Sequence, residues 1–367
     1  MNRNEGMVKE ERIRGGLAIS ISAIVSAEVL QRISDAGFLQ DGHVARLLKV
    51  LLYAAGTLGY PTVFFLLGVS TLASLQRSRA RLLKSLASTV LYPYLLWSIL
   101  QMAVQWLVAD YQDYPAQQFE LARLAWAPIG QFWFLYALFI CQIVAFVTLW
   151  PRPTTVRCAL TVANRSLIVA MILASATVAI RSRWGIVTMT CWGLVFFLAG
   201  VLLASRPDRQ ESHASGVYVA LASAIAFGAA AFMGQRFGHH LDLYSLLTSF
   251  LGVAAALSVG RCLPIWRRSR WIVLIGLTWK PIYLMHVLAT ALVWNALLAF
   301  GIGHPVVHFV LGSAVGLTLP IAIYVLAKRL RVASWAGFAE TAAARSEGAE
   351  SSGKPAPRAD KSAKSRV

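Results

Sequence analysis

Apolar stretches of about 20 residues recur along the chain, and this repetition limits what the sequence can fold into. An α-helix rises about 1.5 Å per residue, so a stretch of about 20 apolar residues crosses a hydrocarbon core of about 30 Å. We identify ten such stretches, at 16–33, 50–75, 85–109, 132–150, 167–180, 185–204, 216–233, 243–259, 272–299 and 306–326. The fifth is short. Hydrophobic residues make up 57% of the 367 residues, well above what the core of a soluble domain needs. The sequence therefore predicts an all-α integral membrane protein, a bundle of about ten transmembrane helices.

The basic residues are distributed unevenly between the two sides that ten spans would create. With the N-terminus in the cytoplasm, 26 of the 34 Lys and Arg residues fall on the cytoplasmic side and seven on the external side, while Lys280 lies within a span. Cytoplasmic loops of membrane proteins carry such an excess of positive charge. We therefore expect a multi-pass protein of the cell (cytoplasmic) membrane with its N- and C-termini in the cytoplasm.

The net charge of +18 by itself would also suit a protein that binds nucleic acid. That function needs a basic face on a folded soluble surface, whereas here the charges lie in the connections between apolar stretches. We expect the lipid bilayer, and no nucleic acid, as a partner.

The chain divides into a long apolar part and a polar end. Residues 1–331 contain all ten stretches and are predicted to form one transmembrane domain. Residues 332–367 are rich in Ser, Gly, Glu, Lys, Pro and Ala, and have almost no large apolar side chain after Phe338. Such a composition does not compensate the entropy of ordering, so we expect a disordered basic cytoplasmic tail.

The four cysteines do not form a pattern of their own. Cys141 and Cys191 fall inside predicted spans, and Cys158 and Cys262 fall near cytoplasmic ends, where thiols stay reduced. We predict no disulfide and no metal site.

Four positive charges, Arg77, Arg79, Arg81 and Lys84, follow the second predicted span within eight residues. Arginine forms bidentate contacts with phosphate oxygens, so the cluster would suit a polyphosphate ligand such as an acyl-CoA. Basic residues also occur here simply to set topology and to contact anionic lipid. Both interpretations remain open on the sequence.

Ionisable groups at membrane depth are costly, which makes each of them a candidate for function. His286, near the middle of a late span, could act as a general base for a hydroxyl acceptor, or could simply be hydrogen-bonded within the bundle. Glu28 lies toward the external end of the first span. Ser26, two residues before it, is of a type that usually serves packing between helices.

Four dispersed segments carry a family resemblance. They read Tyr-Pro-Thr-Val-Phe-Phe-Leu-Leu-Gly at 60–68, Tyr-Pro-Tyr-Leu-Leu-Trp at 92–97, Gln-Phe-Trp-Phe-Leu-Tyr-Ala-Leu at 131–138 and Ile-Tyr-Leu-Met-His at 282–286. In this order, and with ten spans, they resemble the membrane-bound acyltransferase family 3, which includes O-acetyltransferases of cell-surface carbohydrates and fucose 4-O-acetylase-like proteins.

The first span departs from the pattern of that family. Its members open with Asp-x-Leu-(Arg or Lys)-Gly-x-Ala and place a histidine, the presumed base, eight residues beyond the alanine. Here Gly16-Leu17-Ala18 aligns, the aspartate is missing, and the histidine position holds Ser26. A serine does not accept a proton by itself at neutral pH. Either Glu28 or His286 has taken that role, or this member does not catalyse the usual reaction.

The resemblance implies a membrane O-acyltransferase that takes an acetyl or similar group from cytoplasmic acyl-CoA. Acetyl-CoA is the first donor that we expect, and we expect no permanently bound cofactor. The acceptor would be a hydroxyl of a carbohydrate or glycolipid, as in polysaccharide O-acetylation. The implied catalytic residues are His286, Glu28 and Ser26, and the implied donor-binding residues are Arg77, Arg79, Arg81 and Lys84. The alternative is a non-catalytic member that binds or transports a glycolipid or a lipid-linked precursor. A secondary transporter of another fold ranks third. It would need a carboxylate near the middle of the membrane to couple to its substrate, and Glu28, the only acid inside a predicted span, lies off centre.

Overall fold

The computed structural model describes residues 3–38, 42–74, 79–108, 121–149, 156–179, 185–205, 213–234, 242–262 and 269–338. Within these ranges the chain is helical apart from short turns, and it contains no β-strand. Nine helices in the described part are long and apolar enough to cross a membrane, and a shorter apolar helical stretch, Thr161–Ala174, overlaps the short fifth span predicted at 167–180. The prediction of a multi-pass helical membrane protein is confirmed.

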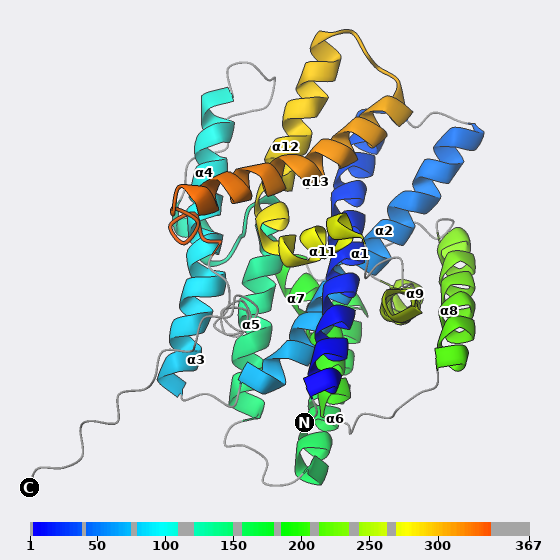
Figure 1. Cartoon of the computed structure of the whole chain (residues 1–367), viewed down its shortest axis with the longest axis vertical. Helices are drawn as coiled ribbons and strands as arrows, with labels where there is room; N and C mark the ends of the chain where they lie inside the picture. Colours follow the sequence, from blue (N-terminus) through cyan, green and yellow to red (C-terminus); the bar gives the residue numbers. More distant parts are fainter. Residues whose placement is uncertain are drawn as a thin grey trace, which may run out of the picture.

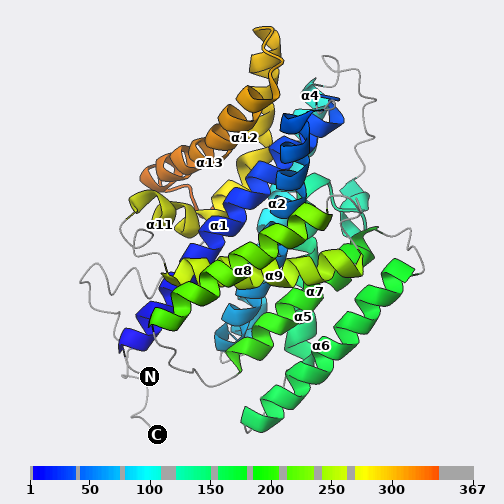
Figure 2. The same cartoon turned by 90° about the vertical axis from the view of Figure 1, so that its right-hand side faces the viewer.

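The helices build one bundle, seen from two sides in Figures 1 and 2. They are α1 (Arg3–Asp35), α2 (His43–Ser74), α3 (Arg79–Leu86), α4 (Tyr92–Val108), α5 (Trp133–Thr148), α6 (Val156–Ala179), α7 (Gly185–Ala204), α8 (His213–Gly234), α9 (Leu243–Cys262), α11 (Arg270–Leu277), α12 (Trp279–Ala299) and α13 (Pro305–Arg329). A π-helical turn, Ala87–Leu91, joins α3 and α4 into one rod at the side of the bundle (Figure 1). Helix α6 lies at the opposite edge from α12 and α13, beside α7 (Figure 2).

Helix α2 packs along both α1 and α7, and its contact with α7 is unusually close. A side chain on Gly68 would collide with the backbone carbonyl of Phe197, and one on Gly200 would collide with the backbone carbonyl of Phe65. Small residues let the backbones of membrane helices approach each other in this way. The glycine that ends the Phe-Phe-Leu-Leu-Gly segment therefore has a structural reason, which is the crossing of α2 and α7.

The span predicted at 272–299 is interrupted. Helix α11 ends at Leu277, Thr278 leaves helical geometry, and α12 begins at Trp279. The physical reason is Pro281, because a proline ring clashes with the carbonyl four residues earlier, here that of Leu277, and provides no N–H for the helix. The break leaves α12 as the membrane-crossing helix, with His286 two turns from its start.

The segment before α5 enters the bundle as irregular backbone. It consists of two 3-10 turns, Leu121–Ala125 and Gly130–Phe132, in which Leu124 and Gln131 are buried. The hydroxyl of Tyr94 in α4 donates to the carbonyl oxygen of Leu124 at 2.6 Å. Non-helical backbone at membrane depth is tolerated where protein surrounds it. This segment therefore brings the start of α5 to the middle of α4.

The polar C-terminal part begins as folded structure. Residues 330–338 form turns that dock on α4, where Tyr92 and Trp97 donate to the carbonyl oxygens of Trp335 and Ala336 at 2.6 and 2.9 Å. Phe338 is buried against the ring of Trp97. Aromatic side chains of α4 therefore hold Trp335, Ala336 and Phe338, which lie in the first part of the segment predicted to be disordered. Residues 339–367 lie outside the described part.

Candidate functional site

The candidate site centres on His286, whose side chain is fully buried in α12. Its Nδ1 atom lies 2.7 Å from the backbone carbonyl oxygen of Tyr283. A carbonyl oxygen only accepts hydrogen bonds, so Nδ1 carries the hydrogen, and in the neutral imidazole Nε2 keeps its lone pair. In the described part of the protein, Nε2 has no hydrogen-bond partner. His286 therefore presents an unused proton acceptor inside the bundle.

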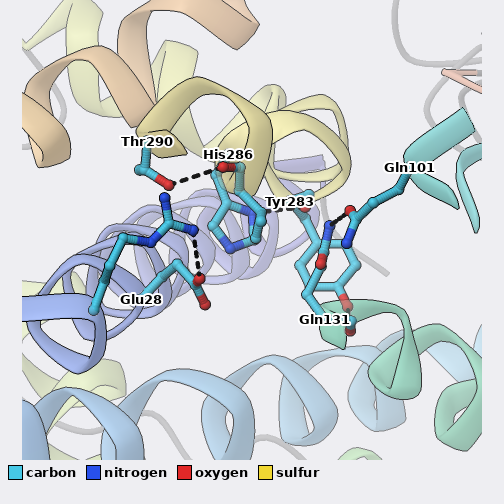
Figure 3. A network of polar contacts seen from close by, with 8 residues as sticks. Glu28, Gln101, Gln131, Tyr283, His286 and Thr290 are labelled. Atoms are coloured by element: carbon cyan, nitrogen blue, oxygen red, sulfur yellow. Dashed lines mark hydrogen bonds and ion pairs between the residues drawn. The ribbon is translucent and has the colours of Figure 1, made fainter. Parts of the chain in front are cut away.

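Tyr283, one turn before His286, is held by a polar chain that crosses to two other helices (Figure 3). Its hydroxyl donates to the backbone carbonyl oxygen of Gln131, in the 3-10 turn just before α5. The side-chain amide of Gln131 in turn donates to the side-chain oxygen of Gln101 in α4 at 2.8 Å. The Tyr283 ring also packs against Phe134, with 5.1 Å between ring centroids. The position of Tyr283, and with it the acceptor of the His286 hydrogen bond, is thus fixed by α4 and α5.

The opposite side of the site is formed by α1. Glu28 and Arg32, one turn apart in α1, form an ion pair of 3.5 Å and are both partly buried. In Figure 3 the Glu28 carboxylate faces the His286 ring. Glu28 is also close enough to His286, Tyr283 and Tyr60 to act on each electrostatically. A carboxylate beside a buried imidazole stabilises the protonated ring, so the pair suits proton transfer.

Comparison with known proteins decides the family. The sequence profile described as an acyltransferase domain, that of acyltransferase family 3, matches residues 14–325, which is most of the chain. The chain belongs to acyltransferase family 3. No curated protein and no solved structure matched it. The match includes every residue of the candidate site, and it confirms the resemblance drawn from the four segments.

Within this family 3 chain, the structure separates Ser26 from the other two candidate catalytic residues. Successive residues of an α-helix are rotated by 100°, so Ser26 projects about 200° away from Glu28 around α1. Ser26 instead shares the side of Gly15, three turns earlier, where α1 touches Gly260 of α9. The structure thus brings Glu28 and His286 together and leaves Ser26 on another face.

Of the predicted donor-binding residues, Arg81 and Lys84 have described side chains, and both lie away from this site. Arg77 falls outside the described residues, and Arg79 begins α3, although its side chain is not described. Arg81 and Lys84 are exposed on α3, which forms the outer end of the α3–α4 rod (Figure 1). Arg81 and Lys84 on α3 are therefore separated from His286 in α12. Only a ligand that extends along the bundle would contact both sites.

Sequence reasoning missed the supporting roles of Gln101, Gln131 and Tyr283. Both glutamines stand in or beside apolar stretches, where an uncharged polar side chain requires a hydrogen-bond partner. That requirement marks them as members of a buried network. The partners themselves could not be found, because Gln101 and Gln131 meet only through the irregular segment before α5.

Proposed function

We propose that this family 3 protein is a membrane O-acyltransferase that moves an acetyl or similar acyl group from acyl-CoA to a hydroxyl of a cell-surface carbohydrate or glycolipid. The observation that carries the proposal is the buried Nε2 of His286, which is an unused proton acceptor beside Glu28 in a chain of an acyltransferase family. An acceptor hydroxyl becomes a useful nucleophile when a positioned base takes its proton.

In the proposed reaction the acceptor O–H gives its proton to Nε2 of His286 while its oxygen attacks the carbonyl carbon of the thioester. A C–O bond forms, the C–S bond breaks, and the thiolate leaves with the proton that His286 returns. Glu28, held by Arg32, stabilises the imidazolium between these two proton transfers. General base catalysis of this kind contributes about 10²–10⁴-fold to the rate.

The donor would arrive from the cytoplasm and the acceptor from the external side. The support for this direction is the charge distribution, because 26 basic residues fall on the side that we assign to the cytoplasm and seven on the other. Arg77, Arg79, Arg81 and Lys84 would then lie on the donor side and hold the phosphates of CoA. The protein would sit in the cytoplasmic membrane with both termini inside.

The test is transfer of label from radioactive acetyl-CoA in membrane vesicles that contain the protein. We expect radioactive acetyl ester in the carbohydrate or glycolipid fraction, released by mild alkali as an O-ester would be. Vesicles from the same host without the protein are the control. Equal labelling of both vesicle preparations would contradict the proposal.

A second candidate, a non-catalytic member that binds or transports a glycolipid, is favoured by one observation. The family histidine of the first helix is replaced by Ser26, and Ser26 lies on a different face of α1 from Glu28. This function predicts saturable glycolipid binding and no acetyl ester in the labelling experiment.

A further inference from the structure

Lys280, in the first turn of α12, is an unusual residue for a membrane-crossing helix. Its Nζ atom is buried and has no hydrogen-bond partner among the described residues. A buried ammonium group without a partner costs several kcal/mol, and intramembrane ionisable residues typically face a pathway or a ligand.

The described side chains provide no counter-ion for Lys280. The acids whose side chains the structure describes are Glu28, Asp35 and Asp242, since the side chains of Glu5, Glu10 and Glu11 in α1 lie outside the described part. Glu28 pairs with Arg32, Asp35 accepts a hydrogen bond from Gln31, and Asp242 accepts one from the backbone N–H of Ser245. Each of these carboxylates is engaged within its own helix or helix start. None of these three carboxylates therefore balances the charge of Lys280, whose Nζ is left without a described partner.

The helical position of Lys280 shows which side of α12 it occupies. Residues three and four apart share a helix face, so Lys280 lies on the face of Tyr283 and Leu284. Tyr283 contacts Gln131, in the turn just before α5, and Gln131 contacts Gln101 of α4. Lys280 is thus on the side of α12 that faces α4 and α5, one turn nearer than Tyr283 to the start of the helix.

We propose that Lys280 binds a phosphate group of the acyl donor within the bundle, and this inference rests on the proposed function. A phosphate supplies both the negative charge and the acceptor oxygens that the buried ammonium lacks. No other described side chain on this face of α12 carries a charge. Lys280 would be a second, interior contact for the donor, beyond the cations of α3.

The spacing along α12 makes Lys280 a binding residue and not a catalytic one. Six residues separate it from His286, which corresponds to about 9 Å of rise and about 120° of rotation. Helical side chains also lean toward the start of the helix, which moves Nζ further from His286. Lys280 therefore contacts a part of the donor remote from the thioester carbon.

The test compares two thioesters, acetyl-CoA and acetylpantetheine, which has no phosphate. With purified full-length protein in nanodiscs, we expect Lys280→Met to weaken acetyl-CoA binding about tenfold or more. The loss of one hydrogen bond to a charged group lowers affinity by about this factor. Binding of acetylpantetheine should be unchanged, and the turnover number at saturating acetyl-CoA should change little. Lys280→Arg, which keeps the charge, should retain most of the acetyl-CoA affinity.

Thermal unfolding of the nanodisc protein separates this role from a structural one. Replacement of an unpartnered buried charge by methionine should leave the melting temperature unchanged or raise it. Unchanged acetyl-CoA affinity in Lys280→Met, or equal weakening of both thioesters, would overturn the inference. Wild-type protein that binds neither thioester would instead contradict the proposed function itself.

Discussion

The Nδ1 atom of His286 lies 2.7 Å from the backbone carbonyl oxygen of Tyr283, its neighbour one turn earlier in α12. This contact orients the imidazole and leaves Nε2 as the proton acceptor. Because the acceptor of the contact belongs to Tyr283, everything that holds Tyr283 also holds the ring. The Tyr283 hydroxyl is bound by the start of α5, so α4 and α5 influence His286 without touching it.

Tyr283→Phe should slow acyl transfer without weakening the binding of the acyl donor. The change removes the hydrogen bond to the Gln131 carbonyl, which contributes about 1 kcal/mol, and a loss of that size in the transition state slows the reaction about fivefold. Turnover at saturating acetyl-CoA and the dissociation constant of CoA are the two measurements. Tyr244→Phe is the matched control, because the Tyr244 hydroxyl also donates to a backbone carbonyl, that of Ala230, away from the site. Equal effects of the two substitutions would argue against a positioning role.

Glu28→Gln should lower turnover at least about tenfold, since loss of about 1.4 kcal/mol of imidazolium stabilisation has that effect. The substitution keeps the shape of the side chain and removes its charge. Steady-state rates with saturating acetyl-CoA measure the effect. Gln31→Ala, an exposed change in the same helix, should leave the rate unchanged. A fully active Glu28→Gln variant would exclude Glu28 from the reaction.

Much of the fold follows from the sequence, because membrane spans have a simple requirement of length and apolarity. The position of His286 inside a late span, and of Glu28 near the end of the first, could be read from the chain. Their approach to each other could not, because it depends on how α1 and α12 cross. The end of α11 at Leu277 could have been predicted from the sequence. Pro281 prevents the carbonyl four residues earlier from accepting a helical hydrogen bond.

The folded turns at residues 332–338 were not predicted, for a related reason. Disorder was predicted from the composition of residues 332–367 as a whole, although Val332, Trp335 and Phe338 at its start are large apolar side chains. The partner that orders them is the aromatic face of α4, where Trp97 contacts both Ala336 and Phe338. Such a contact joins distant segments and has no local pattern.

Gly68→Ala should destabilise the bundle by about 1–3 kcal/mol, a typical cost of overpacking. The new methyl group would meet the backbone carbonyl of Phe197, which cannot move aside as a flexible side chain would. Gly228→Ala in α8 is the control, since open space surrounds that position. Melting temperatures of the two variants in nanodiscs provide the comparison. Similar melting temperatures would contradict the close crossing of α2 and α7.

Arg79→Ala combined with Arg81→Ala should weaken CoA binding while leaving membrane insertion intact, because the other segments predicted to be cytoplasmic keep their basic residues. The expected loss is about tenfold or more for two charge-assisted contacts. The double variant Arg46→Ala and Lys49→Ala removes two exposed charges from the opposite end of α2 and serves as the control. If CoA affinity is unchanged in the α3 variant, these arginines act in topology alone.

The most direct test of the account is the acyl-transfer rate of His286→Gln beside that of His308→Gln. His308 is also buried, and one of its ring nitrogens also lies 2.7 Å from a backbone carbonyl, that of Ile302, so it is a matched histidine outside the network of Figure 3. We expect His286→Gln to lose about 10²–10⁴-fold in turnover with unchanged CoA affinity, as removal of a general base does. His308→Gln should remain active. Full activity of His286→Gln would contradict the assignment of His286 as the base.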